Sequence, residues 1–96
     1  MALTEQQIAL GVARFLEDYP AARREVDELD ETLAQSIGME LEELRQLHAL
    51  ELMGKAARAQ GVDSTAFMVE FALDTPEERA QFLAELEEAH RRAIGL

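Results

Sequence analysis

Hydrophobic residues recur at helical intervals along most of the chain, and glycines, prolines and capping residues separate the periodic stretches. The first helix is predicted to begin at Thr4, because Thr4 and Gln7 have the spacing of a capping box. Its predicted buried stripe consists of Ile8, Val12, Phe15 and Tyr19. Pro20 is predicted to end this helix and start the next one, since proline lacks the amide hydrogen that would be unpaired in a first turn.

A second helix is predicted to continue to Gly38, which suits the left-handed position after a helix C-terminus. Its predicted apolar face carries Val26, Leu29, Leu33 and Ile37. A third helix is predicted from about Glu40 to Gln60, and its apolar residues cover more than one face, as is typical of a central helix or a subunit contact. Gly54 within it costs about 1 kcal/mol relative to alanine, which a close helix crossing would explain.

The segment STAFMVEFAL, residues 64–73, is interpreted as a fourth helix. A strand over residues 66–73 is the alternative, and it would need a pairing strand from a second subunit. The last helix has Thr75 as its N-cap, Pro76 in its first position and Glu78 at N3. Its expected core face consists of Phe82, Leu83, Leu86, Ala89, Ala93 and Ile94. The pattern predicts an all-α fold, a compact single-domain bundle of four to five helices with oblique crossings over residues 1–96.

The charge of the chain changes which partners are expected. Its 20 acidic and 9 basic residues give a net charge of −11 and an isoelectric point near 4.4. Because such a field repels phosphate backbones and anionic lipids, neither nucleic acid nor a membrane is an expected partner. The absence of cysteine excludes disulfides, thiolate nucleophiles and thiolate metal sites. No signal-peptide or membrane-span pattern is recognisable, so a cytoplasmic location is predicted.

Residues 31–48, which include TLAQSIGMELEELRQL, resemble a helix-turn-helix, with Ala34 and Gly38 at the motif's structural positions. The second half is similar to the recognition helix of sigma-factor region four at Glu42, Arg45, Gln46 and Ala49. The resemblance implies a DNA-binding transcription regulator. However, the stretch from Glu25 to Glu43 holds eight acids and no base, whereas a recognition helix needs donors toward bases and phosphates. A helix-turn-helix used for packing is therefore the favoured interpretation.

The sequence GVDST, residues 61–65, resembles the site at which acyl and peptidyl carrier proteins carry phosphopantetheine, which would be attached to Ser64. Carrier proteins have a valine–glutamate pair at +4 and +5 from that serine, whereas Val69 and Glu70 follow at +5 and +6. They also have a long first loop where this chain has a predicted helix. An ordinary N-cap at Asp63 is the competing and favoured interpretation.

Two histidines were candidates for chemistry. Glu87 and His90 have the i, i+3 spacing of carboxylate-bridged metal sites. Such sites need a second Glu-x-x-His, which only a second copy of the chain in a dimer could supply; a surface position for His90 is the favoured interpretation. His48, between Leu44 and Leu52, is interpreted as a partly buried and hydrogen-bonded residue rather than a base. No triad or phosphate loop is present in the sequence. No catalytic residue, metal, cofactor or enzyme activity is therefore predicted.

The leading functional hypothesis is a small acidic interaction module, acting as an adaptor, inhibitor or regulatory subunit, that binds a basic protein and forms a homodimer. A helix-turn-helix regulator and a carrier-like protein are the alternatives. The predicted partner-binding residues are Glu25, Asp27, Glu28, Asp30, Glu31, Glu40, Glu42 and Glu43. The predicted self-association residues are Leu47, Leu50, Met53, Gly54 and Ala57.

Overall fold

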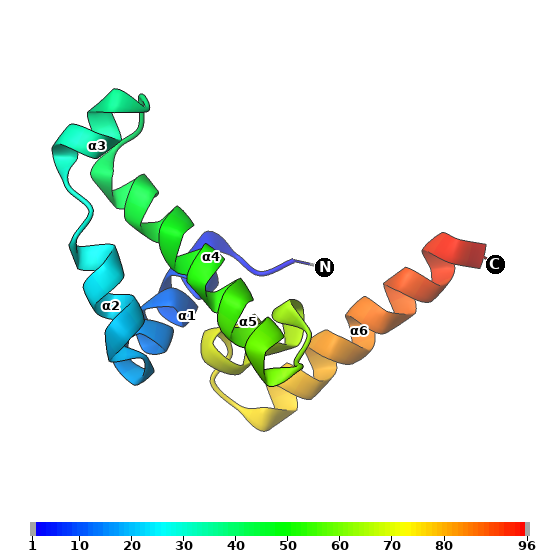
Figure 1. The fold of residues 1–96 in the computed structure, drawn as a ribbon. Coiled ribbons are helices and arrows are strands. Elements are labelled where there is room, and N and C mark those ends of the chain that lie inside the picture. Colours follow the sequence, from blue (N-terminus) through cyan, green and yellow to red (C-terminus); the bar gives the residue numbers. More distant parts are fainter. Residues whose placement is uncertain (1, 96) are drawn as a thin grey trace.

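The computed structural model describes residues 2–95, which form six α-helices joined by short turns (Figure 1). The helices are α1 (Glu5–Asp18), α2 (Pro20–Asp27), α3 (Glu31–Ser36), α4 (Leu41–Gln60), α5 (Ser64–Ala72) and α6 (Pro76–Gly95). The all-α prediction is confirmed, with six helices in place of the four to five expected. Residues 66–73, for which a strand was the alternative, belong to α5 and its C-terminal cap.

The predicted helix starts are confirmed by their hydrogen bonds. At α1, the Thr4 hydroxyl accepts from the Gln7 amide at 3.1 Å, and the Gln7 side chain accepts from the Thr4 amide at 2.9 Å. At α6, the Thr75 hydroxyl accepts from the Glu78 amide at 3.1 Å. These bonds satisfy amides that have no partner within the helix, so the sequence itself fixes where both helices begin.

The predicted second helix is wrong in its extent, because the structure divides it into α2 and α3. The Asp30 carboxylate accepts from the Leu33 amide at 3.0 Å and thereby caps a new helix. The Arg45 guanidinium of α4 donates to the carbonyl of Leu29 at 3.1 Å, which holds the carbonyl that the break leaves free. As a result Leu33 and Ile37 no longer continue the buried face of Val26, and they remain 44% and 55% exposed.

The core lies between α4 and the pair formed by α1 and α5. Its buried cluster consists of Val12, Phe15, Val26, Ala49, Met53, Ala57 and Phe67. Four aromatic rings stack or meet edge to face around Phe15, with centroids 4.6–6.5 Å apart; they are Phe15, Tyr19, Phe67 and Phe71. Helix α4 packs against α1, α2, α3 and α5, which agrees with its broad apolar surface.

Helices α1 and α5 are in close contact at Gly11. A Cβ atom at this position would lie 3.2 Å from the N, Cα and Cβ atoms of Ala72. The sequence predicted a close helix crossing at Gly54, and this prediction is wrong. A Cβ on Gly54 would meet only the end of the Arg58 side chain, at 3.6 Å. None of the neighbours that the structure describes therefore requires a glycine at position 54.

Helix α6 extends away from the body formed by α1–α5 (Figure 1). It packs only against α5, and none of its described residues is buried. The core face predicted for α6 is therefore wrong, and Ile94 is 71% exposed. The radius of gyration is 15.2 Å, compared with about 12.5 Å for a compact chain of this length, because the helix projects from the body.

Candidate functional site

Helices α3 and α4 form a helix-turn-helix unit with a tight glycine turn. Gly38 has a φ of 72°, which is the left-handed conformation predicted for it. The amide of Gly38 donates to the carbonyl of Gln35 at 3.1 Å, and the amide of Met39 donates to the carbonyl of Ala34 at 2.9 Å. Ala34 itself is 1% exposed against α4. The local resemblance to a helix-turn-helix is thus a resemblance of backbone and packing.

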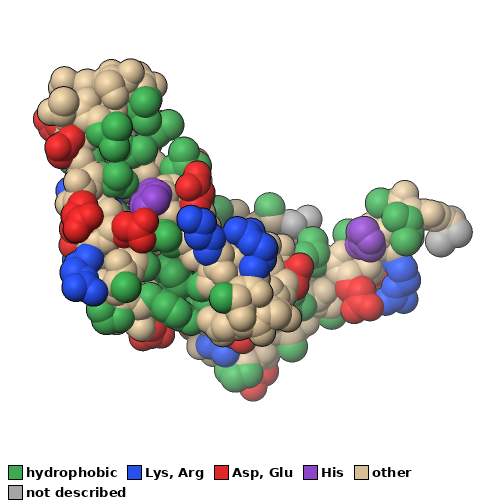
Figure 2. Space-filling model, in the orientation of Figure 1, with side chains coloured by type: hydrophobic (Ala, Val, Ile, Leu, Met, Phe, Trp, Pro, Cys, Tyr) green, Lys and Arg blue, Asp and Glu red, His purple; other side chains and the backbone are tan. Residues whose placement is uncertain are grey.

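Three large apolar side chains of this unit face solvent. Leu33 is 44% exposed, Ile37 is 55% exposed and Leu47 is 48% exposed. Figure 2 shows hydrophobic side chains gathered over α3 and the N-terminal half of α4, with acidic side chains beside them. We name this region, defined by Leu33, Ile37, Leu47, Glu40, Glu42 and Glu43, the α3–α4 surface.

All eight acidic residues predicted to bind a partner are exposed. Three of them also have local roles. Asp30 caps α3, Asp27 lies 3.3 Å from Arg23, and the Glu25 carboxylate lies 3.4 Å from Nε2 of His48. Among the described residues, the side chains of the other five form no ion pair; they are Glu28, Glu31, Glu40, Glu42 and Glu43. The charge available to a partner is therefore concentrated around α3 and the start of α4.

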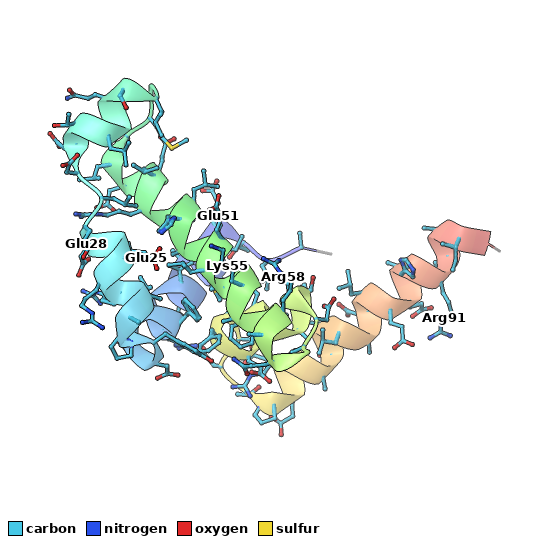
Figure 3. The ribbon with its side chains drawn as sticks, in the orientation of Figure 1. Glu25, Glu28, Glu51, Lys55, Arg58 and Arg91 are labelled. Atoms are coloured by element: carbon cyan, nitrogen blue, oxygen red, sulfur yellow. The ribbon has the colours of Figure 1, made fainter. Side chains whose placement is uncertain are left out.

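Arg23 on α2 pairs with Asp27, but within residues 2–95 no basic side chain pairs with the five free acids. Arg14 pairs with Asp74 at 2.6 Å at the opposite end of the body, and Arg45 is turned inward to backbone carbonyls. Figure 3 shows Lys55 and Arg58 on the C-terminal half of α4, away from the turn at Gly38. Of the four positions that resemble a sigma-factor recognition helix, Ala49 is fully buried and Arg45 is half-buried. The α3–α4 surface thus lacks the cationic border that phosphate contacts require.

The self-association residues divide into two groups. Met53 and Ala57 are 3% and 0% exposed in the core, so their assignment to an open self-association surface is corrected. Leu47, Leu50 and Gly54 remain accessible along one side of α4. Near Leu50 and Gly54 a groove of about 550 Å³ separates the body from the start of α6. Its lining consists of Ala2, Leu3, Ile8, Leu50, Met53, Gly54, Arg58, Ser64, Thr65, Met68, Phe82 and Leu86.

The remaining candidate residues have structural roles. The Asp63 carboxylate accepts from the amides of Thr65 and Ala66 at 3.0 and 3.2 Å, so Asp63 caps α5 as predicted. Ser64 is exposed in the first turn of that helix. His48 is half-buried between Glu25 and Glu51, whose carboxylates lie 3.4 and 3.9 Å from its ring nitrogens.

Residues 2–95 contain neither a metal-binding cluster nor a membrane-spanning helix. No three acidic, histidine or cysteine side chains in this range are placed to hold a metal ion together. No helix in the same range combines the length and apolar content needed to cross a membrane. Gly11 is the position that sequence reasoning missed; a glycine inside a strongly periodic helix is the signal that points to it.

Comparison with known proteins adds the family alone. Neither a curated protein nor a solved structure matches the chain. The sequence profile of one family, described as a family of unknown function (DUF6388), matches residues 1–96. Since the match covers the full length, the chain belongs to this family of unknown function.

Proposed function

We propose that this protein is a small cytoplasmic interaction module whose α3–α4 surface binds a basic, amphipathic segment of a partner protein. The observation that carries the proposal is the exposure of Leu33, Ile37 and Leu47 on a unit that is otherwise acidic. Large apolar side chains grouped on a small domain favour a contact that removes them from water. The acidic residues around them select a partner with positive charge.

The two kinds of residue serve different steps of binding. Burial of an isoleucine or leucine side chain contributes roughly 1.5–3 kcal/mol when it is transferred fully from water, so the apolar residues supply affinity. The N-cap and first turn of α4 carry three acidic residues, Glu40, Glu42 and Glu43. Their negative charge raises the local concentration of a cationic partner. Binding is therefore expected to be fast and to weaken with added salt.

A DNA-binding regulator is the second candidate, and the geometry of the turn favours it. The left-handed Gly38 and the bond from Met39 to Ala34 place α4 after α3 as in a helix-turn-helix. The exposed ends of this unit, however, carry carboxylates where phosphate-binding side chains would be needed. The two candidates differ in the charge of the expected ligand, so one titration series separates them.

The test uses two labelled probes in fluorescence anisotropy, an amphipathic helical peptide of lysine and leucine and a random-sequence DNA duplex. Wild type is compared with Ile37→Ser/Leu47→Ser and with Glu40→Gln/Glu42→Gln/Glu43→Gln. The matched control, Glu17→Gln/Glu70→Gln/Glu77→Gln, removes the same charge from exposed positions outside α3 and α4. We expect each α3–α4 variant to weaken peptide binding by about tenfold, equivalent to roughly 1.4 kcal/mol, and the control to change it by less than about threefold.

Equal losses in the control and the α3–α4 variants would mean that the peptide senses only net charge, which contradicts the proposal. Binding of the duplex with unchanged peptide affinity in all variants would favour the regulator instead. A complementary pull-down from the source cells at low and high salt identifies the natural partner, provided that the Ile37→Ser/Leu47→Ser variant loses the same protein.

A further inference from the structure

Helix α6 and the body of the molecule bound an open apolar groove. Ile8, Leu50 and Met68 line it on the body side, and Phe82 and Leu86 line it on the side of α6. None of the described residues of α6 is buried, although the helix has 20 residues. Beyond its first turns the helix extends away from the other helices (Figure 1). Its apolar residues there are not covered by the rest of residues 2–95.

The apolar residues of α6 follow the spacing of a helix-pairing seam. Phe82, Leu86, Ala89 and Ala93 are separated by four, three and four residues, which places them in one narrow line along the helix. Such a line is narrower than the face that a helix buries against a globular core. It is the pattern by which one helix packs along another helix.

Gly54 supplies a second and independent observation, because it lies in the wall of the same groove on α4. Glycine is a poor residue inside a helix, and no close neighbour within the chain requires it here. Because glycine has no side chain, the backbone of α4 is accessible at this position. A helix from another chain could therefore approach α4 more closely at Gly54 than at its neighbours.

We propose that α6 of a second copy of this chain fills the groove, forming a twofold dimer in which the two α6 helices pair in antiparallel orientation. In this arrangement, α6 of one subunit lies in the groove of the other subunit. There it contacts the Phe82–Ala93 seam of the other α6 on one side and α4 around Gly54 on the other side. A twofold axis makes the contact reciprocal, so both grooves are filled and no open end remains for further association. The contact shares no residue with the α3–α4 surface, so it does not depend on the proposed function.

The sequence of α6 favours one antiparallel register. When Phe82 faces Ala93 of the partner subunit, Leu86 faces Ala89 of the partner subunit, and each layer of the seam combines a large residue with a small one. The flanking position Glu85 then lies opposite Arg92 of the partner subunit, which joins unlike charges. A parallel pairing would instead place Phe82 against Phe82 of the partner subunit and leave Ala89 facing Ala89 of the partner subunit, so large and small residues would not combine.

The area available reaches the lower limit for a specific interface. The seam from Phe82 to Ala93 is about 17 Å long and a helix is roughly 10 Å wide, so each face that it covers measures about 170 Å². Each subunit contributes three such faces: its α6 seam, the flank of α6 that enters the other groove, and its own groove. Together these bury about 500 Å² per subunit, or about 1,000 Å² in total, which is the lower limit for a biological interface.

A covalent trap tests the register directly, because the natural chain has no cysteine. The variant Glu85→Cys/Arg92→Cys is oxidised at micromolar concentration and run on a non-reducing gel. Within one helix these positions are about 10.5 Å apart, too far for a disulfide, so only a contact between subunits can join them. We expect most of the protein to move from 10.7 kDa to twice that mass, while Glu85→Cys and Arg92→Cys alone stay at 10.7 kDa.

A second measurement tests the groove without relying on α6. Gly54→Leu fills the groove with a residue of higher helix propensity, and Ala59→Leu adds the same side chain at an exposed position of α4. By sedimentation equilibrium we expect the wild type and Ala59→Leu to be dimeric, and Gly54→Leu to dissociate at least about tenfold more readily, with its helical circular dichroism retained. A monomeric wild type, equal dimerisation of both variants, or a double-cysteine variant that does not crosslink would each overturn the proposed dimer.

Discussion

Replacing Gly11 by alanine is expected to destabilise the protein, although helix propensity alone predicts the opposite. Alanine in place of glycine inside a helix contributes about 1 kcal/mol of stability. At Gly11 the added Cβ atom would lie 3.2 Å from three atoms of Ala72, two of which belong to the backbone of α5. A backbone cannot rotate away as the end of a side chain can, so α5 has to shift within the aromatic cluster that it shares with α1.

The size of the effect follows from these opposing contributions. Overpacking a well-packed contact costs roughly 1–3 kcal/mol, which leaves a net loss of about 1 kcal/mol after the gain in helix propensity. For a domain of this size, that loss corresponds to a fall in Tm of roughly 4–8 °C. The matched control is Ala13→Gly, at an exposed position of the same helix, where only propensity changes and a loss of about 1 kcal/mol is expected.

The measurement is urea unfolding followed by circular dichroism, with all variants at one protein concentration because self-association makes stability depend on concentration. An unchanged slope with a lower midpoint indicates a true loss of stability. If Gly11→Ala instead unfolds at a higher urea concentration than the wild type, α1 and α5 are not held at the distance that the structure shows. The reasoning from close packing would then be refuted.

Three further predictions concern the turn, the helix break and the carrier resemblance. Arg45→Met should lower the free energy of unfolding, measured by the same urea titration, by about 1.5–3 kcal/mol, because the Leu29 carbonyl loses a charged donor. The control Arg24→Met, at an exposed site, should change it by less than about 0.5 kcal/mol. Gly38→Ala should lower the free energy of unfolding by about 1–2 kcal/mol, and Gly38→Asn by less, because the positive φ disfavours a side chain although none of the described residues lies within 4 Å of the added Cβ. Equal stability of the wild type and both variants would contradict this. Incubation with a phosphopantetheinyl transferase and coenzyme A should leave the intact mass of the protein unchanged, since Asp63 caps α5 and α1 occupies the region where carrier proteins have a loop. A mass increase that is lost in Ser64→Ala would show that Ser64 is a carrier site.

The helix ends were predictable because the groups that determine them are close in the chain. The capping box at Thr4, the N-caps at Thr75 and Asp63 and the left-handed turn at Gly38 all depend on bonds within five residues. The exposure of the eight acidic residues also follows from local chemistry, because charged side chains rarely lose their water without a partner.

The break between α2 and α3 was not predictable from periodicity. Val26, Leu29, Leu33 and Ile37 have helical spacing, and a continuous helix would align them. What separates α2 from α3 is Asp30 as a cap together with Arg45, which arrives from 16 residues later in the chain. The exposure of Leu33 and Ile37, on which the proposed function depends, follows from that distant contact.

The sequence by itself determined the helical class, most helix boundaries and the strongly acidic surface, because these follow from local hydrogen bonds, side-chain periodicity and charge. Only the tertiary structure decided which apolar residues reach the core. It buried Met53 and Ala57, left the seam of α6 open, and placed the close helix crossing at Gly11 rather than Gly54. The physical reason is that a helical stripe specifies only that a face is apolar, whereas the position of neighbouring helices specifies what covers it.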